Sequence, residues 1–66
     1  MKNTVRVERA ILDITQQQLA DAIGVSRNTI NSIESGKYVP STVLALKIAR
    51  YFGKPSDSIF KLEEDD

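Results

Sequence analysis

The sequence predicts a small all-α protein built from five short helices. Three observations support this fold class: apolar residues recur with helical spacing, residues that cap helix N-termini precede these segments, and a glycine follows three of them. At 66 residues the chain has room for one domain, residues 1–66. It contains no cysteine and no histidine, which excludes disulfides and zinc sites built on those residues. We therefore expect no metal, no cofactor and no catalytic residue.

The first two predicted helices are marked by their ends. The first covers roughly residues 5–12. Thr15 begins the second, Gln18 completes a capping box with it, and Gly24 provides a left-handed stop. These signals predict, from the local sequence alone, where the second helix begins and ends.

The remaining helices are bounded by residues of the same kinds. Ser26 caps the third helix, which Gly36 ends. The fourth lies within STVLALKIARYF (residues 41–52) and is closed by Gly53, and Pro55 starts a last helical turn. Apolar residues of the fourth helix cover an arc of roughly 220°, which predicts burial on two sides. This helix is therefore expected at the centre of the domain, with part of it facing a second subunit.

The two ends of the chain, MKNT and FKLEE, have the composition of short strands. Neither is long enough to be stable alone. Paired with each other, they would form a small two-stranded antiparallel ribbon. The alternative is two frayed termini.

The net charge of zero conceals an uneven distribution. The last four residues are EEDD, an acidic tail at residues 63–66, whereas residues 1–62 carry nine basic and five acidic groups, a net of +4. The tail is expected to act as a solubilising end, or to repel DNA outside the docking face or contact a partner. No apolar run reaches the roughly 18 residues of a membrane span, and the start lacks the apolar core of a signal peptide. We expect a soluble, cytoplasmic protein without a membrane contact.

The second and third predicted helices form a helix–turn–helix at about residues 16–35, joined by a turn of suitable length at residues 24–26. One face of the third helix carries polar side chains that are short except for the arginine, and it carries no acid: Arg27, Asn28, Asn31, Ser32 and Ser35. Side chains of this kind can donate and accept hydrogen bonds at base edges in the DNA major groove. The alternative is an ordinary polar surface helix.

The stretch TQQQLADAIGVSRNTINSIESGKYVPS resembles the lambda repressor/Cro-type (XRE-type) helix-turn-helix regulators, particularly their short stand-alone dimeric members. The resemblance runs without a gap from about residue 5 to residue 60. It implies a five-helix lambda-repressor-like DNA-binding domain. It also implies a sequence-specific regulator of transcription that binds double-stranded DNA, most simply a repressor that binds a palindromic operator as a homodimer.

The resemblance also implies roles for individual residues. Base-reading positions are matched by Arg27, Asn28 and Ser32, with Asn31 at the edge of the same face. Phosphate-contacting positions are matched by Gln16, Ser26, Ser35, Lys37 and Tyr38. Arg9 and Glu34 match a structural pair that ties the first helix to the third; the alternative is two unrelated surface charges.

Two positions depart from the family pattern. Asp13 stands where the family usually has glycine, and aspartate tolerates a left-handed turn better than most residues. Glu8 stands where many members place leucine, which weakens the expected core of the first helix.

Surplus apolar residues in the C-terminal half predict a homodimer. The expected contact residues are Tyr51, Pro55, Ile59, Phe60 and Leu62. The alternative is that these residues merely close a small core.

An antitoxin-type protein-interaction module that also binds DNA is the main alternative, with a partner protein that the sequence does not identify. An enzyme is not expected, because the usual nucleophile–base arrangements need histidine or cysteine.

Overall fold

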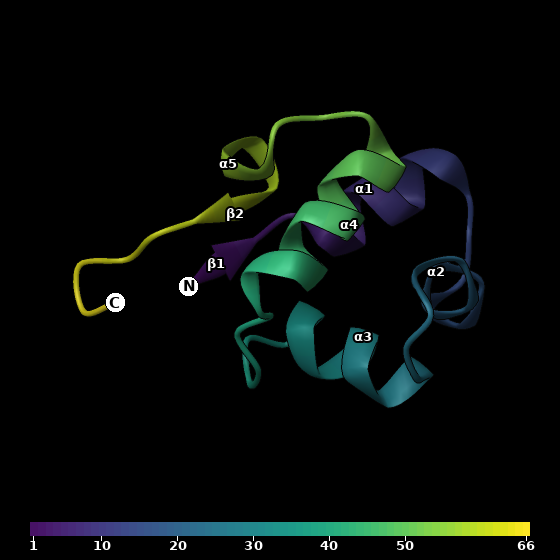
Figure 1. Ribbon diagram of the computed structural model, residues 1–66, viewed down its shortest axis with the longest axis horizontal. Coiled ribbons are helices and arrows are strands. Elements are labelled where there is room, and N and C mark those ends of the chain that lie inside the picture. The colour runs from purple at the N-terminus through teal and green to yellow at the C-terminus, as the bar shows by residue number, and fades with distance from the viewer.

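The computed structural model describes residues 1–66 and contains five helices and a two-stranded antiparallel sheet (Figure 1). The elements are β1 (Lys2–Asn3), α1 (Val5–Leu12), α2 (Gln16–Ile23), α3 (Arg27–Glu34), α4 (Thr42–Phe52), α5 (Ser56–Ile59) and β2 (Phe60–Lys61). This confirms the predicted fold class and the order of the helices. None of the helices has the length and apolar composition that a membrane crossing needs.

The start of α2 has the predicted capping box. The Thr15 hydroxyl accepts a hydrogen bond from the Gln18 backbone N–H at 3.0 Å, and the Gln18 side chain accepts one from the Thr15 backbone N–H at 2.8 Å. The helix ends at Gly24, whose φ of 87° lies in the left-handed region. The local sequence alone accounts for both ends of α2.

Serine hydroxyls cap the next two long helices. Ser26 accepts from the Thr29 N–H at the start of α3, and Ser41 accepts from the Leu44 N–H at the start of α4, each at 3.2 Å. Asp13 ends α1 with φ 55° and ψ 46°, the left-handed turn that the sequence predicted for it.

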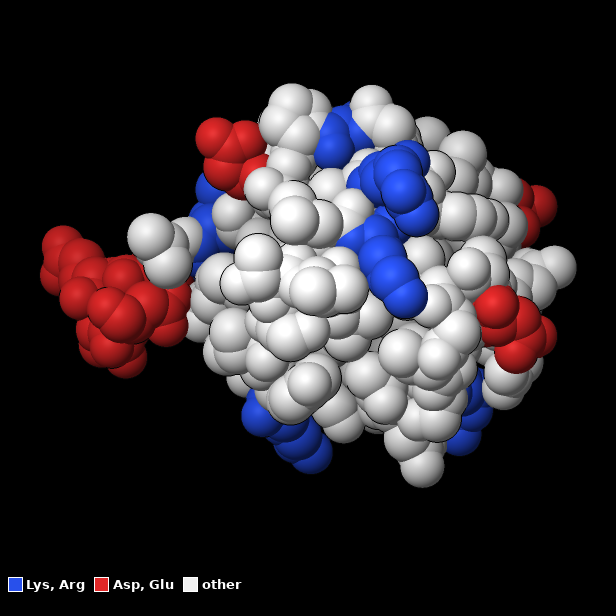
Figure 2. Space-filling view, in the orientation of Figure 1, with Lys and Arg blue, Asp and Glu red and all other residues white.

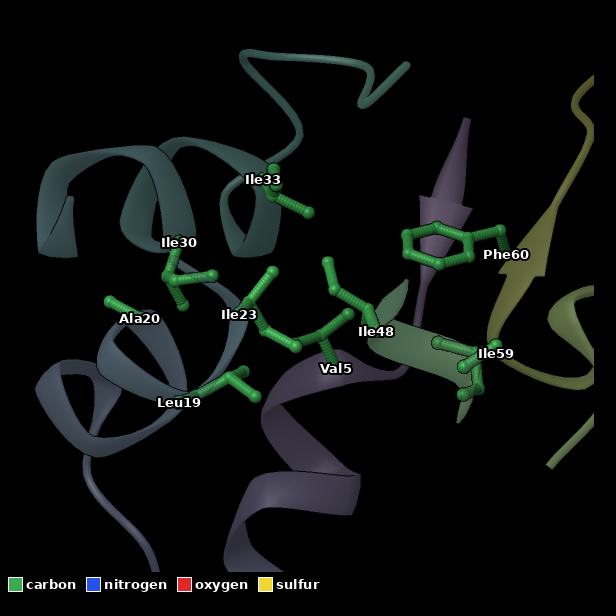
Figure 3. Packing of buried hydrophobic residues seen from close by; sticks show 10 residues of the cluster. Val5, Leu19, Ala20, Ile23, Ile30, Ile33, Ile48, Ile59 and Phe60 are labelled. Atoms are coloured by element: carbon green, nitrogen blue, oxygen red, sulfur yellow. The ribbon is translucent and has the colours of Figure 1, made fainter. Parts of the chain in front are cut away.

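The core lies between the helix–turn–helix, α4 and the ribbon (Figure 3). Side chains from all five helices and from β2 converge there. The ten buried apolar residues are Val5, Leu19, Ala20, Ile23, Ile30, Ile33, Ile48, Ala49, Ile59 and Phe60. Only Val5 represents α1, because Leu12 is half exposed.

Helix α4 runs through the middle of the molecule in Figure 1, but a single chain covers only part of its apolar arc. Ile48 and Ala49 are buried, whereas Leu46 is 53% exposed and Tyr51 is 42% exposed. The expected burial on two sides is therefore incomplete within one chain.

The two ends of the chain pair as the predicted ribbon, so the frayed alternative is wrong. Lys2 lies opposite Lys61 and Asn3 lies opposite Phe60. The Asn3 side chain also donates to the Ile33 carbonyl at 2.8 Å, which connects β1 to the last turn of α3. Beyond the ribbon, the Met1 ammonium group lies 3.2 Å from a Glu63 carboxylate oxygen and 3.1 Å from Asp66 Oδ1.

Glu8 is buried and paired. Its Oε2 accepts a hydrogen bond from Lys54 Nζ at 2.9 Å, just beyond the end of α4. Where many family members have leucine, this chain therefore has an ion pair between α1 and the residues that follow α4. The pairing offsets the cost of burying the carboxylate.

A second ion pair joins α1 to α3, as the family resemblance implied for Arg9 and Glu34. Arg9 Nε donates to Glu34 Oε2 at 2.8 Å and its Nη2 donates to Oε1 at 3.2 Å, so the guanidinium grips both carboxylate oxygens. The Glu34 side chain has no exposed surface. Burial alone would raise the pKa of this carboxyl, but hydrogen bonds from Arg9 and Gln16 outweigh it and hold the pKa below its ordinary value.

Replacing the carboxylate, in Glu34→Gln, is expected to lower the free energy of unfolding by about 1.5–3 kcal/mol at pH 7. Because the folded-state pKa of Glu34 is lowered, its contribution is complete above the ordinary value of 4.5 and is lost as pH falls through the folded-state pKa. Denaturant titrations at several pH values should therefore show the difference between wild type and variant shrinking in acid. Glu64→Gln, in the exposed tail, is the control, and an equal difference at all pH values would contradict the assignment.

Thr4 provides a second test of the packing. It precedes α1 without capping it, because Asn3 Oδ1 accepts from the Val5 N–H instead, and its own buried hydroxyl has no hydrogen-bond partner. Thr4→Val keeps the shape and removes this unpaired group, so the free energy of unfolding should rise by roughly 1 kcal/mol. The exposed Thr42→Val should change it by less than about 0.5 kcal/mol. Denaturant titration measures both, and a clear loss of stability in Thr4→Val would show that the hydroxyl is needed.

Candidate nucleic-acid interface

Helix α3 exposes the polar face that the sequence predicted. Its apolar side, Ile30 and Ile33, is buried in the core, and in Figure 1 the helix lies along the lower edge of the molecule. The polar face of α3 consists of Arg27, Asn28, Asn31 and Ser35, which are exposed, and Ser32, which is half-buried. A helix of eight residues is about 12 Å long, and the face contains no acid that phosphate would repel.

The N-terminus of α2 lies beside the start of α3. One open hollow is lined by residues of the α1–α2 turn and the first turn of α2 together with Arg27: Arg9, Asp13, Ile14, Thr15, Gln16, Gln17 and Arg27. The first turn of α2 carries no acidic side chain, so the partial positive charge of the helix end is not neutralised there. The helix end itself therefore favours an anion, while Arg27 and the Asp13 carboxylate place one charge of each sign around the hollow.

Gln16 makes two hydrogen bonds that the sequence did not reveal. Its Nε2 donates to Glu34 Oε1 at 3.1 Å and to Asn31 Oδ1 at 3.2 Å. The residue predicted to contact phosphate thus also contacts a residue predicted to read bases. Only a helical wheel of α3 combined with the α2–α3 crossing would have suggested this contact.

The loop after α3 folds back against the polar face. The Ser32 carbonyl accepts hydrogen bonds from the backbone N–H groups of Lys37 and Tyr38, at 3.0 and 3.2 Å. A shallow hollow is lined by Asn28, Thr29, Ser32 and Tyr38. The structure therefore brings Tyr38 next to the predicted base-reading residues, although the sequence had grouped it with the phosphate contacts.

Both serines that were predicted to contact phosphate use their hydroxyls in hydrogen bonds within the chain. Ser26 Oγ caps α3 and lies 3.0 Å from Thr29 Oγ1, and Ser35 Oγ donates to the Ser32 carbonyl at 3.1 Å. Lys37 is exposed and makes no ion pair within the chain. Among the five residues predicted to contact phosphate, Lys37 is therefore the cation that is free to bind one.

The residues predicted for the dimer contact are divided by the structure. Tyr51, Pro55 and Leu62 are exposed, but Ile59 is completely buried and Phe60 is 8% exposed. Ile59 packs in the core of its own chain, so its assignment to a partner surface was wrong. Phe60 also belongs to that core, although it lines a shallow surface groove.

Charge is distributed unevenly over the surface. Figure 2 shows the acidic side chains of the tail gathered at one end, while Lys and Arg side chains lie over α4 on the body of the molecule. Lys47 and Arg50 line a groove between α2 and α4, together with Ala22, Ile23 and Tyr51. No group of three histidine, cysteine, aspartate or glutamate residues is arranged to hold a metal ion.

Comparison with known proteins agrees with this geometry. A family model described as helix-turn-helix matches residues 5–59. An uncharacterised HTH-type transcriptional regulator of Methanocaldococcus jannaschii is 50% identical, and one of Bacillus subtilis is 44% identical, each over 66 residues that cover the whole of both chains.

A more distant similarity reaches a phage protein. The CTXphi transcriptional repressor RstR of Vibrio cholerae is 35% identical over 65 residues, which cover 91% of this chain and 56% of that protein. The family match and these relatives cover the helix–turn–helix and the helices that support it. The chain therefore belongs to the helix-turn-helix family and is a DNA-binding transcriptional regulator of the XRE type.

Proposed function

We propose that the chain represses transcription by binding a palindromic operator as a homodimer in the cytoplasm, and that it has no enzymatic activity. The observation that carries this proposal is the exposed, acid-free polar face of α3 beside the unneutralised N-terminus of α2. A relative that is 35% identical is named a transcriptional repressor, which supports repression over activation.

Within this proposal the interface divides into two kinds of contact. Arg27, Asn28, Asn31 and Ser32 read base edges, because they are short or forked polar groups on one side of α3. The backbone N–H groups at Gln16 and in the rest of the first turn of α2 hold one phosphate, because the Gln16 side chain donates to Glu34 and Asn31, and Lys37 holds another from the loop after α3. Ser26, Ser35 and Tyr38 border these contacts and position the backbone near the DNA strand.

A single copy makes too few contacts for a specific site. Its reading helix has eight residues, and the only cations near the polar face without an ion pair are Arg27 and Lys37. Affinity that depends on phosphate neutralisation is therefore low for one copy. Two copies related by a two-fold axis would read half-sites about 34 Å apart and double both kinds of contact.

The exposed apolar surface around the start of α4 is the proposed contact between the copies. Val39 is 56% exposed, Val43 is 64% exposed and Leu46 is 53% exposed. A groove of about 280 Å³, lined in part by Val39, Leu46 and Phe60, supports this choice. The proposed contact is nearer the start of α4 than the one expected from the sequence.

The position of this surface favours two-fold docking on DNA. The loop that leads from α3 to α4 passes beside the C-terminal end of α3 (Figure 1). Two copies that meet at the start of α4 can therefore carry both α3 helices on the same side of the dimer, which a palindromic operator requires.

Arg27→Ala and Lys37→Ala should weaken DNA binding in different ways. Arg27→Ala should cost roughly 1–3 kcal/mol and relax the preference at one base pair of each half-site. Lys37→Ala should weaken binding to all sequences and reduce the salt dependence of the binding constant. Binding titrations on the selected operator and on single-base variants, at several salt concentrations, measure both effects. Equal weakening on all sequences by Arg27→Ala would instead assign that residue to a phosphate.

The dimer surface can be tested without DNA. Leu46→Lys places an unpaired charge in the proposed contact and should raise the dimer dissociation constant at least roughly tenfold. Leu12→Lys is the matched control, because Leu12 is 50% exposed, compared with 53% for Leu46, but lies at the end of α1. Sedimentation equilibrium at roughly 10–100 μM protein measures both variants. A wild-type protein that stays monomeric at those concentrations would contradict the homodimer.

A further inference from the structure

Four side chains from three helices form a continuous hydrogen-bonded series that ends on the polar face of α3. Arg9 in α1 donates two hydrogen bonds to the Glu34 carboxylate in α3. Gln16 in α2 donates to the same carboxylate at 3.1 Å and to Asn31 Oδ1 at 3.2 Å. Each member is therefore oriented by the one before it.

The carboxylate fixes which end of the Gln16 amide points inward. An ionised carboxylate accepts hydrogen bonds and cannot donate them, so the Gln16 atom that faces Glu34 must be the NH₂ group. The same NH₂ group faces Asn31 and must be met there by an acceptor. Asn31 consequently turns its oxygen towards α2 and leaves its own NH₂ group, a donor, for an external partner.

This orientation matters because base pairs differ in the pattern of donors and acceptors that they present. An asparagine recognises adenine by donating to N7 and accepting from the N6 amino group at the same time. Guanine presents two acceptors, N7 and O6, and no donor at that edge. With its oxygen directed at Gln16 and its NH₂ group directed outward, Asn31 presents the donor that guanine N7 and O6 accept. The two-bond contact with adenine would require the oxygen to turn away from Gln16 towards the N6 amino group.

We propose that Gln16 is a positioning residue that fixes Asn31 as a hydrogen-bond donor, so that the base pair facing Asn31 is read as guanine in preference to adenine. This inference rests on the proposed function, because it assumes that the polar face of α3 enters the major groove. Asn28 provides a contrast within the same helix. Its exposed side chain makes no hydrogen bond within the chain, so both amide groups remain available for the adenine pattern. Two identical residue types thus acquire different preferences from their surroundings.

Selection of bound sequences from a random DNA pool tests the proposal with the full chain and its variants. Asn31→Ala identifies the base pair that faces Asn31, because the base preference should be lost at that position of the selected sequences. Wild type should favour guanine over adenine at that pair, and Gln16→Met, which keeps the length and removes the donor, should shift the ratio towards adenine by roughly tenfold. Gln16→Lys restores a donor that can reach both Glu34 and Asn31 and should retain the guanine preference.

Gln17→Met is the matched control. Gln17 lies in the same turn of α2, but its side chain donates to Asp21 at 2.8 Å and does not contact Asn31. It should leave the base preference unchanged. Melting curves followed by circular dichroism establish that each variant is folded at the selection temperature.

The outcomes separate this inference from the proposed function. A wild-type preference for adenine at the Asn31 base pair, or an unchanged preference in Gln16→Met, would overturn the inference and leave DNA binding intact. Uniform weakening by Asn31→Ala, without any change in base preference, would assign Asn31 to a phosphate and overturn it too. Selection of no sequence at all would overturn the proposed function and this inference with it.

Discussion

The buried Glu34 carboxylate makes the contacts on which the placement of the polar face of α3 depends. It belongs to α3 and is buried, the cation that pairs with it comes from α1, and a further hydrogen bond comes from the Gln16 amide in α2. An isolated buried carboxylate would be too costly to keep, so the charge holds the three helices in the one geometry that supplies Arg9 and Gln16 together. The crossing of α2 and α3, and therefore the alignment of the two surfaces expected to meet DNA, follows from this requirement. The apolar core packs the same helices together, and the ion pair adds a contact whose bonds require one arrangement of their side chains.

Local features of the structure could be predicted from the sequence because neighbouring residues determine them. The Thr15–Gln18 capping box, the Ser26 cap and the left-handed Asp13 each depend on a few adjacent residues, and each is present. The ribbon and the Arg9–Glu34 pair are long-range contacts. For them the composition of the chain ends and the family resemblance supplied what local patterns lack.

Other long-range contacts could not be predicted. The Gln16–Asn31 and Glu8–Lys54 bonds join residues 15 and 46 positions apart, and they depend on how the helices cross. A helical wheel shows which residues of α4 are apolar but not which of them the rest of the chain covers. For that reason Ile59 was placed on a partner surface although it is buried in its own chain.

The hydrogen bond between Asn3 and the Ile33 carbonyl connects the end of α3 to the first segment of the chain. Carbonyl groups in the last turn of a helix lack partners within it. The Ile33 carbonyl accepts from the Gly36 N–H at 3.0 Å, and Asn3, in a strand at the other end of the sequence, donates to it as well. That strand is itself ordered by pairing with β2. The end of α3 is thus connected to the pairing of the two ends of the chain. A chain shortened by proteolysis at either end would lose this connection, and the Ile33 carbonyl would then be bound only by the loop that follows α3.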